Sequence, residues 1–148
     1  MTLASKLRTL PGRVATGAYI LHAGMEKWQA DEERAAGLHK MAAGAFPQLE
    51  QLSPAQFVKA LSLVEMATGG ALLLPVVPES IAGLALSSFS GGLLTLYWKT
   101  PGLRRENSPW PSQAGLAISK DVWMFAIGLG LLAEAATGAC RKKKKRRG

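Results

Sequence analysis

The stretch MATGGALLLPVVPESIAGLALSSFSGGLLTLYW, residues 66–98, contains a single charged residue, Glu79. A helix that crosses the hydrocarbon core of a bilayer needs about 20 predominantly apolar residues. This stretch is long enough to supply most of two such helices. The segment PVVPES, residues 75–80, divides it, because proline interrupts a helix. The stretch lacks the alternation of apolar and polar residues that is typical of strands in membrane barrels. We therefore predict two membrane-spanning helices joined by a short turn.

Two further apolar segments complete a set of four spans. The second span has the clearest start, because Ser53, Pro54 and Gln56 form the pattern of a capping box. A soluble four-helix bundle would need a polar face on each helix, and the third span has no charged face. The predicted fold class is all-α, a four-helix transmembrane bundle. Its spans are predicted at about residues 11–28, 55–75, 78–98 and 120–138.

The loop after the first span contains RAAGLHKMAAGAF, residues 34–46. Its apolar residues can share one side of a short interfacial helix. We predict that this helix lies in the first external loop and caps the bundle or covers a pocket; a plain connector is the alternative. His39 is expected to be solvated. The apolar side consists of Ala35, Leu38, Met41, Ala42, Ala45 and Phe46.

The positive charge of the chain is concentrated at its C-terminus. Of the 18 basic residues, seven lie in the tail 140–148, and the remainder nearly balances the 10 acidic residues. Basic residues favour the cytoplasmic side, so we predict a multi-pass protein of the plasma membrane with both termini in the cytoplasm. Residues 1–10 form the N-terminal arm, and residues 11–139 the membrane domain. The tail is predicted to bind anionic lipid rather than nucleic acid, because no aromatic residues interrupt it. Its basic residues are Arg141, Lys142, Lys143, Lys144, Lys145, Arg146 and Arg147.

Small residues recur at helical spacing within the spans. They let helix backbones approach closely in lipid, where no hydrophobic force drives association. In the first span, Gly17 and Gly24 share a face with Arg13 and Lys27, whereas His22 lies on nearly the opposite side. The predicted helix-packing residues are Gly17, Gly24, Gly69, Gly83, Ser87, Gly91 and Gly130.

Two carboxylates, Glu65 and Glu134, lie inside predicted spans. An ionisable group costs a few kcal/mol there, so it should face the bundle interior, pair with a cation or be protonated. Glu65 has two interpretations. It either joins Arg13, Lys27 and His22 in a polar pocket for a cofactor, or forms an ion pair that only fixes helix register. Glu134 is expected near the basic tail.

Cysteine and histidine chemistry is restricted by the composition. Cys140 is the only cysteine, which excludes an intrachain disulfide and a cysteine-based zinc site. The chain has two histidines, and only His22 lies in a predicted span, so a haem with two histidine ligands is not predicted. We predict no metal site and no catalytic residue.

Four short motifs resemble the DoxX-like family of small four-span bacterial membrane proteins, over roughly residues 13–139. They are GAYILHAGMEKW at 17–28, EMATGGALLLPV at 65–76, KTPGLRR at 99–105 and SKDVWM at 119–124. The family is named after a small subunit of a thiosulfate:quinone oxidoreductase. The resemblance implies a membrane subunit or scaffold in redox or thiol homeostasis that docks soluble or membrane partner proteins.

Three functions follow as hypotheses. The first is a subunit without catalysis of its own, which docks partners and holds a lipid or quinone near Arg13, His22 and Glu65. The second is a subunit of a quinone oxidoreductase in which His22 or Glu65 donates a proton, and the third is a small transporter. No flavin motif is present, so an enzyme that acts alone is not predicted. The sequence leaves open whether the chain forms a homo-oligomer.

Overall fold

The computed structural model describes the backbone of residues 3–145 and the side chains of residues 7–140. Within that range the chain is helical and contains no strand, which confirms the all-α prediction. The elements are α1 (Leu3–Trp28), α2 (Glu32–Ala45), the 3-10 helix η1 (Pro47–Gln51), α3 (Pro54–Leu73), α4 (Glu79–Lys99), α5 (Leu116–Ser119) and α6 (Asp121–Lys145).

Local sequence signals account for the ends of the inner helices. The Ser53 hydroxyl accepts a hydrogen bond from the Gln56 N–H at 3.2 Å, and the Gln56 side chain accepts one from the Ser53 N–H at 3.0 Å. This is the predicted capping box, and it starts α3 at Pro54. The helix α4 starts at Glu79, directly after the second proline of the PVVPES segment.

Both terminal helices are longer than the predicted spans. The helix α1 begins at Leu3 rather than Pro11, and α6 continues through Gly138 to Lys145. The last span, predicted to end at about residue 138, is therefore part of a longer helix. Alanine, leucine, lysine and arginine favour helix, and they dominate both extensions, so the chain stays helical beyond the apolar segments.

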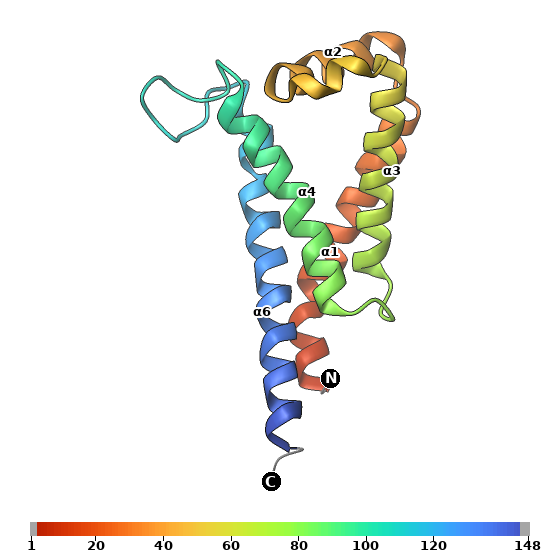
Figure 1. Cartoon of the computed structure of the whole chain (residues 1–148), viewed down its shortest axis with the longest axis vertical. Coiled ribbons are helices and arrows are strands. Elements are labelled where there is room, and N and C mark those ends of the chain that lie inside the picture. Colours follow the sequence, from red (N-terminus) through yellow and green to blue (C-terminus); the bar gives the residue numbers. More distant parts are fainter. Residues whose placement is uncertain (1–2, 146–148) are drawn as a thin grey trace.

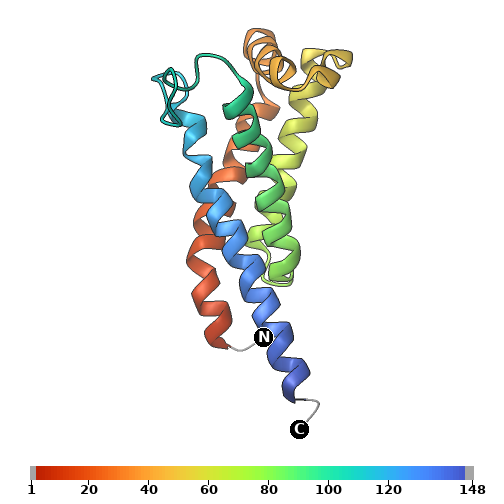
Figure 2. The same cartoon turned by 60° about the vertical axis from the view of Figure 1, so that its left-hand side comes forward.

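The four long helices form two antiparallel pairs, α1 with α3 and α4 with α6. Figure 1 shows that the pairs converge at the end where α1 begins and α6 ends, and that they diverge toward the opposite end. The helix α2 lies across this open end, as the turned view in Figure 2 also shows. Its main contacts are with α3, and it also touches α4.

Two apolar clusters hold the arrangement together. One lies under α2 and joins Ala42 to Phe57, Leu96 and Tyr97. The prediction that the apolar side of residues 34–46 caps the bundle agrees with this contact, because Ala35, Ala42 and Ala45 are all buried. The other cluster lies between the pairs and consists of Ile20, Leu72, Ala82, Leu86 and Leu131.

Glycines determine how closely α1 and α3 approach. A Cβ atom added to Gly69 would lie 2.7 Å from the backbone nitrogen of Leu21, and one added to Gly17 would lie 2.9 Å from the Leu72 Cβ. A Cβ on Gly24 would lie 2.9 Å from the Met66 side chain. These distances are too short for a side chain, so the helices touch backbone to backbone at the three positions the sequence predicts.

The contact between α4 and α6 uses a different glycine from the one predicted. A Cβ on Gly83 would lie 2.9 Å from the Gly128 carbonyl oxygen, and one on Gly128 would lie 2.4 Å from the Ser87 hydroxyl. Gly91 has only the Phe125 ring near it, at 3.4 Å, and Gly130 has no neighbour within 4 Å. The prediction for Gly130 is wrong, because α6 turns Gly128 toward α4 and leaves Gly130 on the outside.

Among the described residues, two segments are long and apolar enough to cross a membrane, α4 and the stretch Leu116–Cys140 that contains most of α6. Only 17% of the most apolar window in the second segment is buried, whereas the core helix of a soluble protein is mostly buried. The helices α1 and α3 do not meet the same criterion of length and composition. The four-span arrangement therefore stays a prediction.

The glycine contacts predict opposite effects for neighbouring substitutions. We expect Gly69→Ala and Gly128→Ala to lower the free energy of unfolding by about 1–3 kcal/mol, because the new methyl group meets backbone or a buried side chain. The matched controls, Gly70→Ala and Gly130→Ala, have open space around the added methyl. They should leave stability unchanged or raise it by up to about 1 kcal/mol, since alanine favours helix. Thermal unfolding in detergent micelles measures the difference, and equal effects within each pair would contradict the close packing.

Candidate functional site

A cleft between the two helix pairs is the best candidate for a functional site. It has a volume of about 470 Å³ and lies where the pairs diverge beneath α2. Its walls are mostly apolar and aromatic, with Tyr19 from α1, Phe57 from α3, Phe89 and Leu93 from α4 and Met124 from α6. Small-molecule sites in proteins are typically apolar clefts of roughly 300–1,000 Å³, so both its size and its lining fit a ligand site.

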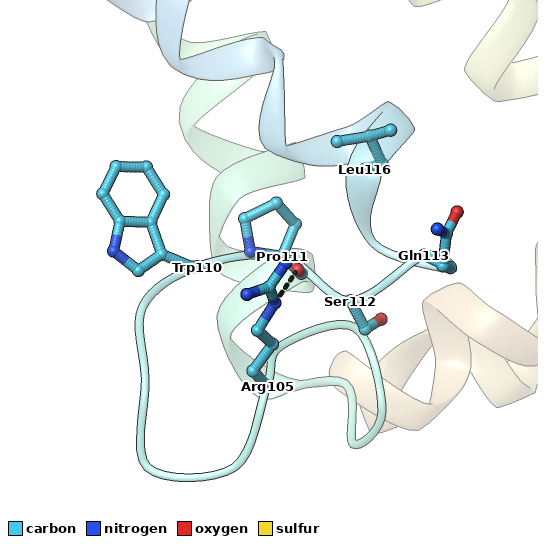
Figure 3. Close-up of a pocket in the computed structure, with 6 residues that line it drawn as sticks. All are labelled: Arg105, Trp110, Pro111, Ser112, Gln113 and Leu116. Atoms are coloured by element: carbon cyan, nitrogen blue, oxygen red, sulfur yellow. Dashed lines mark hydrogen bonds between the residues drawn. The ribbon is translucent and has the colours of Figure 1, made fainter.

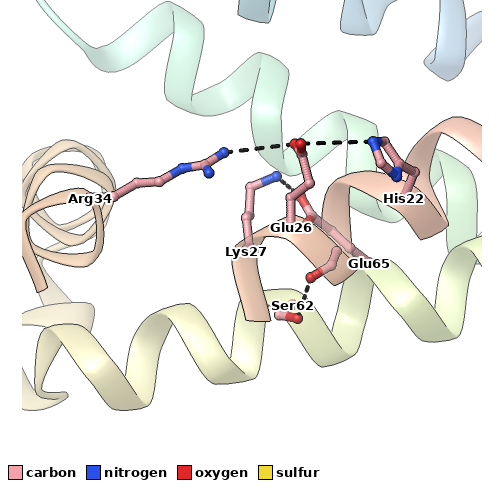
Figure 4. Close-up of polar contacts among 7 residues, drawn as sticks. His22, Glu26, Lys27, Arg34, Ser62 and Glu65 are labelled. Atoms are coloured by element: carbon pink, nitrogen blue, oxygen red, sulfur yellow. Dashed lines mark hydrogen bonds and ion pairs between the residues drawn. The ribbon is translucent and has the colours of Figure 1, made fainter. Parts of the chain in front are cut away.

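An ion pair between α1 and α3 lies in the wall of this cleft. The Lys27 Nζ is 2.9 Å from the Glu65 Oε1, and the two side chains are only 18% and 6% exposed. Figure 4 shows the pair beside Ser62, whose hydroxyl donates a hydrogen bond to the Gly24 carbonyl at 2.6 Å. Both contacts fix the register of the two helices. Breaking a buried pair by removing one partner typically costs about 3–5 kcal/mol.

The second carboxylate oxygen of Glu65 has no partner among the described residues. Glu65 Oε2 is buried and accepts no hydrogen bond from them, and the same holds for the Ser87 and Thr100 hydroxyls and the Arg104 Nε. Buried polar atoms are nearly always hydrogen-bonded, so each of these is an exception. The free oxygen belongs to a residue of the cleft wall.

A second acidic residue reaches the cleft from the opposite helix pair. Asp121, the first residue of α6, is buried and lines the cleft, and its charge interacts with those of Glu65 and Lys27. The sequence does not single out Asp121, because an acidic residue at a helix start is a common N-terminal signal. Only the packing of α6 against the cleft shows its position.

Arg13 is not part of the cleft, which corrects the predicted pocket. Its guanidinium donates to the carbonyl oxygens of Leu72 at 2.8 Å, Val77 at 3.0 Å, and both Ala71 and Leu74 at 2.9 Å. The last carbonyls of a helix lack partners within the helix, and Arg13 supplies donors for those of α3. It lies near the converging end of the bundle, and its role there is to hold the turn between α3 and α4.

His22 also lies outside the cleft, although it was predicted to belong to the pocket. Its side chain is 73% exposed, and its Nε2 is 3.8 Å from the Glu26 Oε1. The other oxygen of that carboxylate, Glu26 Oε2, lies 4.0 Å from the Arg34 guanidinium. Figure 4 shows this chain of contacts on the side of α1 away from Ser62. Of the four residues predicted for the pocket, the structure therefore brings together only Lys27 and Glu65. His22 faces outward, as its helical position opposite Gly17 and Gly24 indicates.

Glu134 pairs with Arg8 of α1 at 3.3 Å. Its expected place near the basic tail stays a prediction. The side chains of Arg141 to Lys145, and residues Arg146 and Arg147 altogether, lie outside the described residues. His39 is not simply solvated, because its Nε2 lies 2.8 Å from the Leu49 carbonyl oxygen and its ring packs against Phe57.

The loop between α4 and α5 contains a second hollow, of about 530 Å³, shown in Figure 3. Arg105 is its only ionisable lining residue, and its Nε donates to the Pro111 carbonyl at 3.2 Å. Gly102 lies in the left-handed region, at φ 85°, and permits the turn that starts this loop. Because Arg105 is used to close its own loop, we assign no ligand to this hollow.

Comparison with known proteins does not name a family. No protein-family model matches the chain, and no curated protein and no solved structure matches it either. The resemblance to the DoxX-like family therefore stays a prediction that rests on the four short motifs.

The cleft combines two kinds of recognition. Its apolar walls can hold a hydrophobic body, and Lys27, Glu65 and Asp121 provide one positive and two negative groups for a polar head. Among the described residues, no group of three or more His, Cys, Asp or Glu side chains could hold a metal ion. The cleft therefore offers an apolar space and ionisable groups side by side.

The carbonyl contacts of Arg13 predict that lysine cannot replace it. Lysine keeps the charge but lacks the planar fork that reaches several acceptors at once. We expect Arg13→Lys to lower the free energy of unfolding in detergent by at least about 2 kcal/mol, because buried carbonyls lose their donors. The control Arg8→Lys affects the more exposed pair with Glu134 and should change stability by less than about 1 kcal/mol. Similar stability of the two variants would show that the Arg13 contacts contribute little.

Proposed function

We propose that this chain is a four-span integral membrane protein that holds an amphipathic molecule, a quinone or a lipid, in the cleft between its helix pairs. The observation that carries the proposal is the cleft itself, an apolar space of about 470 Å³ with three ionisable residues in its wall. Apolar walls favour a hydrocarbon body, and buried charges in a membrane are usually functional.

Exposed apolar side chains support the membrane environment. They occur on all four long helices, including Leu10 and Val14 on α1, Leu63 and Val64 on α3, and Leu84 on α4. Soluble monomers rarely expose large contiguous apolar surface, because hydrating it is unfavourable. In lipid the same surface has no such cost. The proposed spans thus include α1 and α3, whose charged residues lie mainly toward the helix ends or in the bundle interior.

The four tryptophans support an orientation. Trp28 ends α1, Trp98 lies at the end of α4, Trp110 lies in the following loop and Trp123 begins α6, so all four occur at the α2 end of the bundle. All are exposed. Tryptophan is enriched at membrane–water interfaces, and basic residues at the cytoplasmic side. We therefore place α2 at the outer surface and the basic tail in the cytoplasm.

The role proposed for the ligand follows from the family resemblance. A membrane subunit that docks soluble or membrane partners can supply them with a quinone or lipid, which links the chain to redox or thiol homeostasis. The proposal includes no catalytic step by this chain. It separates into two testable parts, the orientation in the membrane and the occupancy of the cleft.

The single cysteine allows the orientation to be tested. Cys140 is exposed near the C-terminus, so a membrane-impermeant maleimide should label it only after the cells that express the chain are permeabilised. The variant Cys140→Ser/Gln48→Cys moves the only thiol to η1 at the opposite end of the bundle, and intact cells should label it. Labelling of both positions from the same side would contradict the four-span topology.

The cleft can be tested by filling it. Gly92 lines the cleft and has open space around it, so we expect Gly92→Phe to fold and to occupy part of the ligand volume. Native mass spectrometry of the detergent-purified chain measures binding of added decylubiquinone and of diacylglycerol. We expect at least one of them to bind, and its affinity to fall by about tenfold or more in Gly92→Phe.

The matched control is Gly130→Phe, which adds the same side chain on the outer surface of α6. It should bind like the unmodified chain. Absence of binding by both molecules, or equal losses in the two variants, would reject the cleft as the ligand site.

A further inference from the structure

The charge of the cleft restricts the head group of its ligand, an inference that rests on the proposed function. Lys27, Glu65 and Asp121 are the ionisable residues that line the cleft, and together they leave one negative charge in excess. Lys27 is already paired with Glu65 at 2.9 Å. An anionic head group would therefore enter a site whose only cation is engaged, beside two carboxylates that repel it.

Neither nearby arginine lines the cleft. Arg13 uses four of its five N–H donors on backbone carbonyls at the converging end of the bundle. Arg34 is about half exposed and contacts Glu26, and although its charge also acts on Glu65, it does not belong to the lining. The cleft thus lacks a free cation within the described residues.

The hydrogen bonding of the cleft points in the same direction. Glu65 Oε2 is buried and has no donor within the described residues, although Glu65 lines the cleft. An unpaired buried acceptor is unfavourable, because its hydrogen bonds to water are lost and not replaced. A ligand that supplies an O–H or N–H group to the carboxylate would remove this cost. Hydrogen bonds to a carboxylate are also stronger than those between neutral groups. A carboxylate and the dianion of a phosphate monoester supply no such donor, and both carry negative charge.

We propose that the cleft selects an amphipathic molecule whose head group, a hydroxyl or an ammonium, donates a hydrogen bond to the Glu65 carboxylate, and that it rejects anionic head groups. Asp121 from the opposite wall supplies the second negative charge and strengthens the selection. Among quinones and lipids, this favours the hydroxyl-bearing forms, a quinol or a lipid alcohol, over fatty acids and phosphatidic acids. A free alcohol and a quinol share this donor chemistry.

A head-group series on one alkyl chain tests the selection. We use native mass spectrometry of the full chain in detergent with dodecanol, dodecylamine and dodecyl phosphate, which differ only in the head. Dodecanol and dodecylamine should each bind at least about tenfold more tightly than dodecyl phosphate. A quinol and its quinone form a second comparison, in which the quinol should bind more tightly. The affinities for the quinol and for dodecanol then distinguish a quinol from a free alcohol as the source of the hydroxyl.

Variants of the two carboxylates test whether their charges cause the selection between head groups. Glu65→Gln removes one negative charge. We expect the affinities for dodecanol and dodecylamine then to lie within about threefold of the affinity for dodecyl phosphate. Asp121→Asn, which leaves the Lys27–Glu65 pair intact, should reduce it in part and provides the test if Glu65→Gln does not fold. The control Glu26→Gln removes a charge outside the cleft and should keep the full preference.

The outcomes separate this inference from the proposed function. Equal binding of all three head groups, or tighter binding of dodecyl phosphate, would overturn the selection and leave the cleft as a ligand site. An equal loss of preference in Glu26→Gln would also overturn it, since a general effect of charge would then suffice. Binding of none of the molecules, with decylubiquinone and diacylglycerol also inactive, would overturn both proposals.

Discussion

The close contact between α1 and α3 is the constraint on which the rest of the structure depends. It requires glycine at three positions, because the backbones touch there and leave no room for a Cβ. This approach brings Lys27 against Glu65 and places Arg13 beneath the last carbonyls of α3. A larger residue at Gly69 would separate the helices and break both polar contacts. One steric feature therefore positions the charged groups at both ends of the pair.

The two helix pairs do not pack evenly along their length, and the cleft results from this difference. At the converging end, Gly12 approaches Ile127 and Arg8 pairs with Glu134, so α1 and α6 lie close together. At the other end, α2 inserts its alanine face between the pairs and packs on Phe57 and neighbouring residues of the apolar cluster. The helix that caps the bundle therefore also covers the space beneath it (Figure 2).

The polar groups of the cleft come from three different helices, which gives the proposed site its specificity. The apolar walls admit many hydrophobic bodies, whereas the Lys27–Glu65 pair and Asp121 set the charge that a head group meets. A low dielectric environment strengthens such interactions, since water does not screen them. In the proposed site, affinity for the body and selection of the head would thus arise from different residues.

The sequence by itself determined the all-α class, the capping box of α3, the helix within residues 34–46 and the small-residue face of α1, because these depend on local propensity and helical spacing. It did not determine which face of α6 meets α4, since Gly128 and Gly130 are both small. Nor did it separate Arg13 and His22 from Glu65, or bring Asp121 to the cleft. Those features depend on how helices that are distant in sequence rotate and cross, which only the tertiary structure decides.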